Sequence, residues 1–384
     1  MKQLSKIMLA AVASVALAVP ALAWDFGASG SSSATWKQVT VTPATGDATV
    51  DTNFSSSSGG VTVSSSNSDG ANSATFSYTA DWNGDAGNFD EYVTVSGSKK
   101  VGNWTASSST SQYMNKDATA GASPMTSGGT AAITLTDGSI TYKLGDAAHL
   151  STAEKTSGGP MSGAVDAEAR VDSFNGFSVG LGVGPGTLTV ALDHNSGAAS
   201  TSMGDLGIGI ACGGQGTGFG LNFAGDVGAD LSFTFASGSS VPSATYCTDN
   251  NSSNAASSST MGLGVAVPMG AMTIALDYES SGTSNTAAKV ETKFAQSGFE
   301  ISLTMGGIAD GTAGINISSQ ATSTTVGTGD AAEGTNAGTE LWWTVPIGPV
   351  SLAVGYGMGS ATTGSTTKVT AVTTQMGAEM SMSF

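Results

Sequence analysis

The segment Gln375-Met-Gly-Ala-Glu-Met-Ser-Met-Ser-Phe384 ends the chain with a strict alternation of residue type. The apolar side chains of this segment are those of Met376, Ala378, Met380, Met382 and Phe384. Glutamine, glycine, glutamate and serine fill the positions between them. Successive side chains of a β-strand point to opposite faces, so the segment is expected to form a strand with one apolar and one polar face.

The same period of two recurs along the chain, and no segment shows the 3.6-residue period of an amphipathic helix. Apolar residues alternate with polar ones over residues 74–82, 231–235 and 299–305. A glycine-containing hairpin occurs three times, at 183–194, 267–278 and 345–356, and each copy leads into an alternating strand. The sequence therefore predicts an all-β protein.

Short turns are expected near residues 102, 137, 226 and 308 as well as at the three hairpins. They alternate with long connections rich in Ser, Thr, Asn and Gly. A membrane barrel carries short turns on one rim and long loops on the other, whereas a β-sandwich mixes loop lengths at both ends. Because no side-chain consensus recurs between the turns, an adhesin stalk or a β-solenoid is the less favoured alternative.

We therefore predict that residues 24–384 form a transmembrane antiparallel β-barrel. The turn spacing gives 16 strands with short periplasmic turns and long extracellular loops. The region from Trp24 to about Gly70 is hard to fit, and an extra hairpin there would give 18 strands.

Composition excludes several other classes of protein. The 384 residues carry 12 basic and 29 acidic side chains, a net charge of -17, which would repel nucleic acid. Hydrophobic residues make up 39%, below the ~45–50% of soluble domains, as expected for a wall with a single apolar face. Beyond residue 23 no apolar run reaches the ~18 residues of a membrane-spanning helix.

Residues 1–23 have the features of a cleavable secretory signal peptide. Lys2 and Lys6 precede an apolar run over residues 7–19, and Ala21-Leu-Ala23 fits the cleavage pattern. A membrane anchor is the alternative, but the run is short for one. Export would permit a disulfide between Cys212 and Cys247, although two unrelated thiols fit the sequence equally well.

With a signal peptide and barrel periodicity in place, the end of the chain resembles the targeting strand of bacterial outer-membrane barrels. That strand ends in an aromatic residue and alternates apolar positions. The resemblance implies insertion into outer-membrane lipid and recognition by the barrel-assembly machinery through Met376, Met380, Met382 and Phe384. An ordinary edge strand that ends in phenylalanine is the alternative.

Two internal segments resemble parts of the general porins of Gram-negative bacteria. Residues 136–146 resemble the hairpin before the constriction loop of that family, and residues 168–181 resemble the strand after it. The resemblance implies that residues 146–172 fold into the barrel and narrow the pore. It also implies a homotrimer and no cofactor.

The candidate constriction loop is rich in charge. Its charged residues are Asp146, Glu154, Lys155, Asp166, Glu168, Arg170 and Asp172. Five of the seven are acidic, so a wet constriction lined by them would favour cations or neutral solutes, while a solvated external loop is the alternative. General porins set several arginines opposite this loop, but Arg170 is the only arginine here, so we expect a weak transverse field.

Other candidate sites are weak. His149 and His194 are the only histidines and belong to no recognisable nucleophile arrangement, which favours surface or rim positions and argues against an enzyme. Asp81, Asn83 and Asp85 have the spacing of a calcium loop without its later glycine and glutamate, so an Asx-rich loop is the better interpretation.

The sequence favours passive diffusion of ions and small hydrophilic solutes through an outer-membrane porin. The main alternative is a non-transporting surface barrel or adhesin with partner-binding loops. An outer-membrane hydrolase is disfavoured by the scarcity of histidine.

Overall fold

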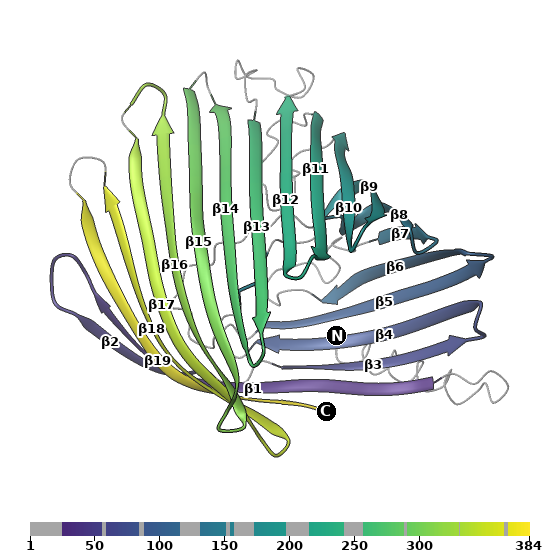
Figure 1. Cartoon of the computed structure of the whole chain (residues 1–384), viewed down its shortest axis with the longest axis horizontal. Helices are drawn as coiled ribbons and strands as arrows, with labels where there is room; N and C mark the ends of the chain where they lie inside the picture. Colours follow the sequence, from purple (N-terminus) through teal and green to yellow (C-terminus); the bar gives the residue numbers. More distant parts are fainter. Residues whose placement is uncertain are drawn as a thin grey trace. The chain divides into compact units, whose positions relative to one another are not determined.

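The computed structural model describes residues 25–55, 59–83, 88–115, 131–150, 154–156, 173–196, 215–241, 256–287, 290–329, 331–364 and 368–384. Every regular element in these ranges is a β-strand, as the alternation predicted (Figure 1). None of the described residues forms a helix long and apolar enough to cross a membrane. The predicted signal peptide, residues 1–23, lies outside the described residues.

The described strands are β1 (Asp25–Thr42), β2 (Thr49–Ser55), β3 (Gly59–Ser68), β4 (Asn72–Asn83), β5 (Asn88–Val101), β6 (Trp104–Asn115), β7 (Ala131–Thr136), β8 (Ile140–Ala148), β9 (Ser173–Val183), β10 (Gly186–Ser196), β11 (Gln215–Asp226), β12 (Asp230–Val241), β13 (Ala256–Met269), β14 (Met272–Ala287), β15 (Val290–Ile308), β16 (Gly311–Val326), β17 (Ala332–Ile347), β18 (Val350–Gly364) and β19 (Val369–Ser383). They fall into two compact units. The first unit holds the start of β1, strands β3 to β7 and the end of β19; the second holds the rest of β1, β2, β8 to β18 and most of β19.

From β3 onward, strands that follow one another in the chain pair antiparallel in every described register. The pairing of β19 with β1 closes this succession, which is the strand order of a closed antiparallel barrel.

The number of strands differs from the main prediction. β2 and β3 pair with successive parts of β1 in registers that differ by one residue, so together they fill one place in the strand order. The nineteen described segments thus occupy eighteen places. The predicted 16 strands were wrong, and the alternative of 18, with an extra hairpin in the region 24–70, is confirmed. The cause is that β3 alternates only over Val61-Thr-Val63 and is polar on both faces from Ser64 to Ser68, so its sequence gives little of the alternation used to count strands.

The short turns lie where the sequence predicted them. Gly102, Gly184, Gly270 and Gly348 sit between paired strands with φ angles of 62°, 58°, 68° and 61°. This left-handed conformation suits glycine and is required in the tightest hairpins. In the turn between β15 and β16, Ala309 and Asp310 adopt this left-handed conformation in place of glycine.

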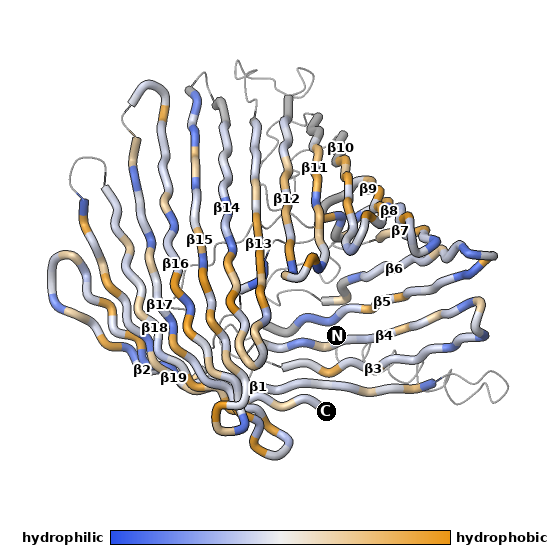
Figure 2. Tube along the Cα trace, in the orientation of Figure 1, coloured by the Kyte–Doolittle hydropathy of each residue, from blue (hydrophilic) through white to orange (hydrophobic). Residues whose placement is uncertain are grey.

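The two faces of the sheet are inverted relative to a soluble protein. Among the described residues, 15 polar or charged and only 6 hydrophobic residues are buried, while 36 large hydrophobic residues are exposed. In β14, Asp277 and Glu279 are 1% and 5% exposed, whereas Leu276 and Tyr278 between and beside them are 37% and 36% exposed. We call these the polar face and the apolar face. Hydrophobic residues recur along β9 to β18 (Figure 2), and an outward apolar face of this kind is stable against lipid.

The end of β19 has the predicted alternation. Met376, Met380, Met382 and Phe384 are exposed. The backbone of Phe384 exchanges two hydrogen bonds with Gly30 of β1, of 2.8 and 2.9 Å. The Phe384 ring lies over Gly30, where a Cβ atom would come within 2.6 Å of it. The last residue of the chain is therefore fixed at the junction of β19 and β1.

Candidate functional site

The chain that follows β8 turns onto the polar face of the second unit. His149, the first residue after the strand, is only 3% exposed. Its Nε2 donates to the Gly145 carbonyl oxygen at 2.8 Å, so its Nδ1 accepts the Ser178 hydroxyl at 2.9 Å. The surface or rim position expected for His149 was therefore wrong. Both ring nitrogens have partners, which is what allows this polar side chain to be buried.

Leu150 continues the contact across three strands. Ala191 of β10, Gly220 of β11 and Ala236 of β12 are register partners in a row. Leu150 is buried in a cluster with the two alanines, and a Cβ atom on Gly220 would lie 2.5 Å from its Cδ1. Three small residues in register therefore form a shallow seat for this leucine.

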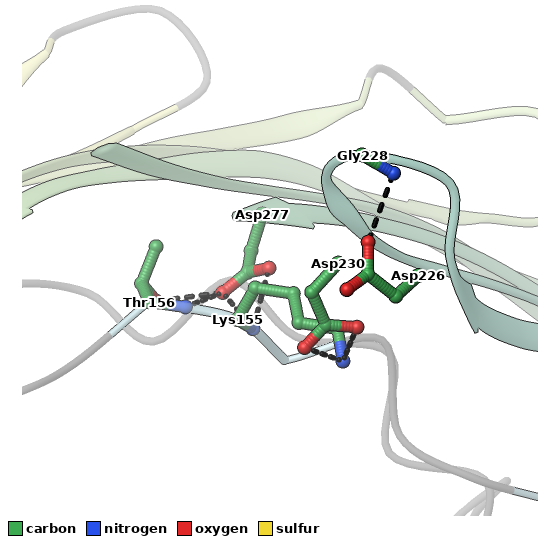
Figure 3. A network of polar contacts seen from close by, with 6 residues as sticks. All are labelled: Lys155, Thr156, Asp226, Gly228, Asp230 and Asp277. Atoms are coloured by element: carbon green, nitrogen blue, oxygen red, sulfur yellow. Dashed lines mark hydrogen bonds and ion pairs between the residues drawn. The ribbon is translucent and has the colours of Figure 1, made fainter. Parts of the chain in front are cut away.

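Further along, residues 154–156 attach to β14 (Figure 3). The Lys155 backbone N–H donates to both carboxylate oxygens of Asp277, at 2.8 and 2.9 Å. The backbone N–H and the hydroxyl of Thr156 donate to Asp277 Oδ2 at 2.7 and 2.6 Å. One carboxylate thus accepts four hydrogen bonds from this tripeptide, across 121–122 positions of sequence.

The Lys155 side chain makes a second attachment. Its ammonium group lies 2.9 Å from a carboxylate oxygen of Asp230, the first residue of β12. Asp226, at the other end of the same turn, accepts the Gly228 backbone N–H at 2.9 Å. The Asp230 side chain is 54% exposed, so solvent screens this ion pair and its contribution is about 0–1 kcal/mol.

More carboxylates lie beside Asp277 on the polar face. Glu300 of β15 is its register partner, and Glu279 follows two positions later on β14. Side-chain amides donate to both: Asn316 to Glu300 at 3.0 Å, and Gln296 and Gln320 to Glu279, the latter at 3.3 Å. Glu340 of β17, which is 1% exposed, is the register partner of Asn316. The polar face of β14 to β17 is therefore an acidic band held by amide groups.

The structure brings together only part of the predicted site. Lys155 and the exposed Glu154 lie in the attached segment. Asp146 belongs to β8, where it shares its strand face with the exposed Leu144, while Lys143 and Gly145 lie on the opposite face. Asp166, Glu168, Arg170 and Asp172 lie outside the described residues.

Sequence reasoning missed Asp277, Asp230, Glu300 and Glu340. A signal was present for two of them, because β14 and β15 each set an acid, Asp277 or Glu300, between hydrophobic neighbours. Exposure of a carboxylate to lipid costs much free energy, so an acid at such a position is expected on the face of the sheet that points away from lipid.

The remaining candidate sites receive no support from the structure. Asp81 lies in β4, but the Asn83 side chain and Asp85 fall outside what the structure describes. Cys212 and Cys247 also lie outside it. Over the described part of the chain, no group of three or more His, Cys, Asp or Glu residues is placed to hold a metal ion.

No family model and no curated protein matches the sequence. Solved structures do match. The chain is similar to the anion-selective porin from Comamonas acidovorans, with a TM-score of 0.51 and 11% identity over 94% of this chain and 100% of that one. The chain has the fold of an outer-membrane porin. The porin fold accounts for the closed strand order and for the inverted faces.

Two other solved structures match with lower scores. They are the outer membrane channel DcaP of Acinetobacter baumannii, with a TM-score of 0.48 and 11% identity over 94% of this chain and 97% of that one, and OpdO of Pseudomonas aeruginosa, with 0.46 and 12% over 93% and 97%.

Proposed function

We propose that this chain is an outer-membrane porin through which ions and small hydrophilic solutes diffuse passively. The observation that carries this proposal is the attachment of His149, Leu150 and residues 154–156 to the polar face. When the apolar face of a barrel meets lipid, the polar face surrounds water. A segment of chain that crosses the polar face narrows the aqueous passage and leaves it lined by polar groups. Diffusion through such a passage requires no cofactor and no reaction.

We also propose a preference for cations. Asp277, Glu279, Glu300 and Glu340 place four acids on one part of the polar face, and Glu154 adds an exposed one on the attached segment. The ammonium group of Lys155 is paired with Asp230. Although these four acidic residues are only 1–6% exposed, their charge makes this part of the wall negative, and a negative pore wall attracts cations. The similar Comamonas porin is named as anion-selective, but selectivity depends on the charges that line a pore and not on the fold.

The rest of the proposal concerns location and assembly. Residues 1–23 direct export and are removed, and residues 24–384 are inserted into the bacterial outer membrane by the barrel-assembly machinery. The barrels associate as a homotrimer. Support comes from the sequence features of the two ends and from the resemblance to general porins.

Planar-bilayer recording of the purified protein tests this function. The expected result is stepwise conductance of an open channel. With unequal concentrations of potassium chloride on the two sides, the reversal potential should have the sign of a cation-selective pore. A reversal potential of the opposite sign would contradict the ion preference alone. A closed trace from folded protein would contradict the channel and support a non-transporting surface barrel.

A further inference from the structure

The attachment of residues 154–156 depends on one carboxylate. Asp277 accepts four hydrogen bonds with both of its oxygens, and all four donors come from Lys155 and Thr156 (Figure 3). An ionised carboxylate has acceptor sites only, so it matches a group of donors. A protonated carboxyl group places an O–H among these donors, and the match is lost.

The other contacts of the segment are of different kinds. Leu150 sits in its seat through apolar packing. His149 lies between a carbonyl and a hydroxyl group, and the Ser178 hydroxyl can either donate to a ring nitrogen or accept from it, so protonation of His149 leaves both bonds possible. The Lys155–Asp230 pair is exposed on the Asp230 side. Asp277 is therefore the contact on which residues 154–156 depend most.

The charged groups that the structure describes around Asp277 are mostly acidic. Glu300 is its partner on β15, Glu279 is the next residue on the same face of β14, and Glu154 adjoins Lys155 in the attached segment. On the side of β13 the register partner is Gly264, which carries no charge. The nearest described cation is Lys155, whose ammonium group points to Asp230 (Figure 3). Acid therefore relieves repulsion in this group of carboxylates and removes the attachment in the same step.

We propose that Asp277 is a positioning residue that holds the narrowing segment in place only while it is ionised, so that acid opens the passage. This proposal rests on the proposed channel function. Release at residues 154–156 leaves the chain seated at His149 and Leu150, which act as the fixed end. The passage then widens on the side of β12 to β14.

Conductance as a function of pH tests the consequence. Wild-type channels should conduct more at pH 4 than at pH 7.5. Asp277→Asn should conduct at pH 7.5 as the wild type does in acid, with no further rise. Asp277→Glu should restore a rise with acid. The control is Glu333→Gln, which removes an exposed carboxylate of β17 that bonds Lys368 and should keep the wild-type pH profile.

A spin label tests the attachment without any need for conduction. Glu154 is exposed, so Glu154→Cys in a Cys212→Ser/Cys247→Ser background can be labelled and its mobility measured in lipid vesicles. The label should be restrained at pH 7.5 and mobile at pH 4, and mobile at both values when Asp277→Asn is added. A label equally restrained in all four conditions would overturn the proposal, even if the channel conducts. A silent channel with a pH-dependent label would overturn only the proposed function.

Discussion

Single residues on the polar face show what the sequence could and could not predict. The alternation of β14 indicates that Asp277 lies opposite Leu276 and Tyr278, and the structure confirms this. Its partners could not be predicted, because Lys155 and Thr156 lie more than a hundred positions earlier and no local pattern links a strand to a loop that crosses it. The seat of Leu150 was hidden for the same reason, since Gly220 has a role only through its neighbours across the sheet.

The Leu150 seat leads to a test of packing. Gly220→Ala should lower the free energy of unfolding by about 1–3 kcal/mol, because the new Cβ would lie 2.5 Å from Leu150 Cδ1 and must displace that side chain. Urea unfolding in lipid vesicles measures the loss. The double variant with Leu150→Ala has no such clash. Its loss in free energy of unfolding should therefore be smaller than the sum of the losses of the two single variants.

Gly282→Ala is the matched control for this substitution. A Cβ there meets nothing closer than 3.7 Å, an ordinary contact, so stability should be unchanged or slightly higher. Equal losses at Gly220 and Gly282 would mean that Leu150 is not seated on β11.

At the scale of elements, the sequence predicted most of the strands and turns, because each of them depends on residues that are adjacent in the chain. Alternation located β4, β12, β15 and β19 and the strands that follow the three hairpins, β10, β14 and β18, and glycine located the turns. The prediction failed where much of a strand is polar on both faces, as in the second half of β3. β2 and β3 occupy one place in the sheet because both pair with β1. The sequence of a single strand does not reveal its pairing partner.

The hairpin of β15 and β16 is strained at its turn. Ala309 and Asp310 have φ angles of 48° and 62°, a region that costs a residue with a Cβ atom about 1–2 kcal/mol. Asn-Gly is the preferred pair for a two-residue turn with both φ angles positive. Ala309→Asn with Asp310→Gly should therefore stabilise the barrel by about 1 kcal/mol.

Urea unfolding in vesicles is again the measurement, with Gly348→Ala as a control of opposite sign. Gly348 has a φ of 61°, so an alanine there should destabilise by about 1 kcal/mol. If the Asn-Gly variant were less stable than wild type, a role for the Asp310 side chain would outweigh the backbone strain.

For the whole molecule, composition and architecture have the same physical cause. A chain with 39% hydrophobic residues cannot fill a large apolar core, but it can cover one face of a wall and leave the other face to water. Closure then pairs the backbone groups that lipid could not satisfy. Closure also requires a long-range pairing, because β19 pairs with β1, the first described strand of the chain.

A substitution at Phe384 can test recognition of this last strand separately from the stability of the barrel. The residue is 66% exposed, while its backbone makes two hydrogen bonds to Gly30 where β19 pairs with β1. Phe384→Ala keeps those backbone bonds, so the purified protein should refold in detergent with a free energy of unfolding within about 1 kcal/mol of wild type.

In cells, however, the amount of folded protein in the outer membrane should fall several-fold, if the terminal aromatic ring is what the assembly machinery recognises. Met358→Ala removes another exposed hydrophobic side chain, that of a residue 48% exposed on β18, and should leave assembly unchanged. Equal losses in cells for both variants would assign the effect to lipid contact, and a matching loss on refolding would assign it to closure of the sheet.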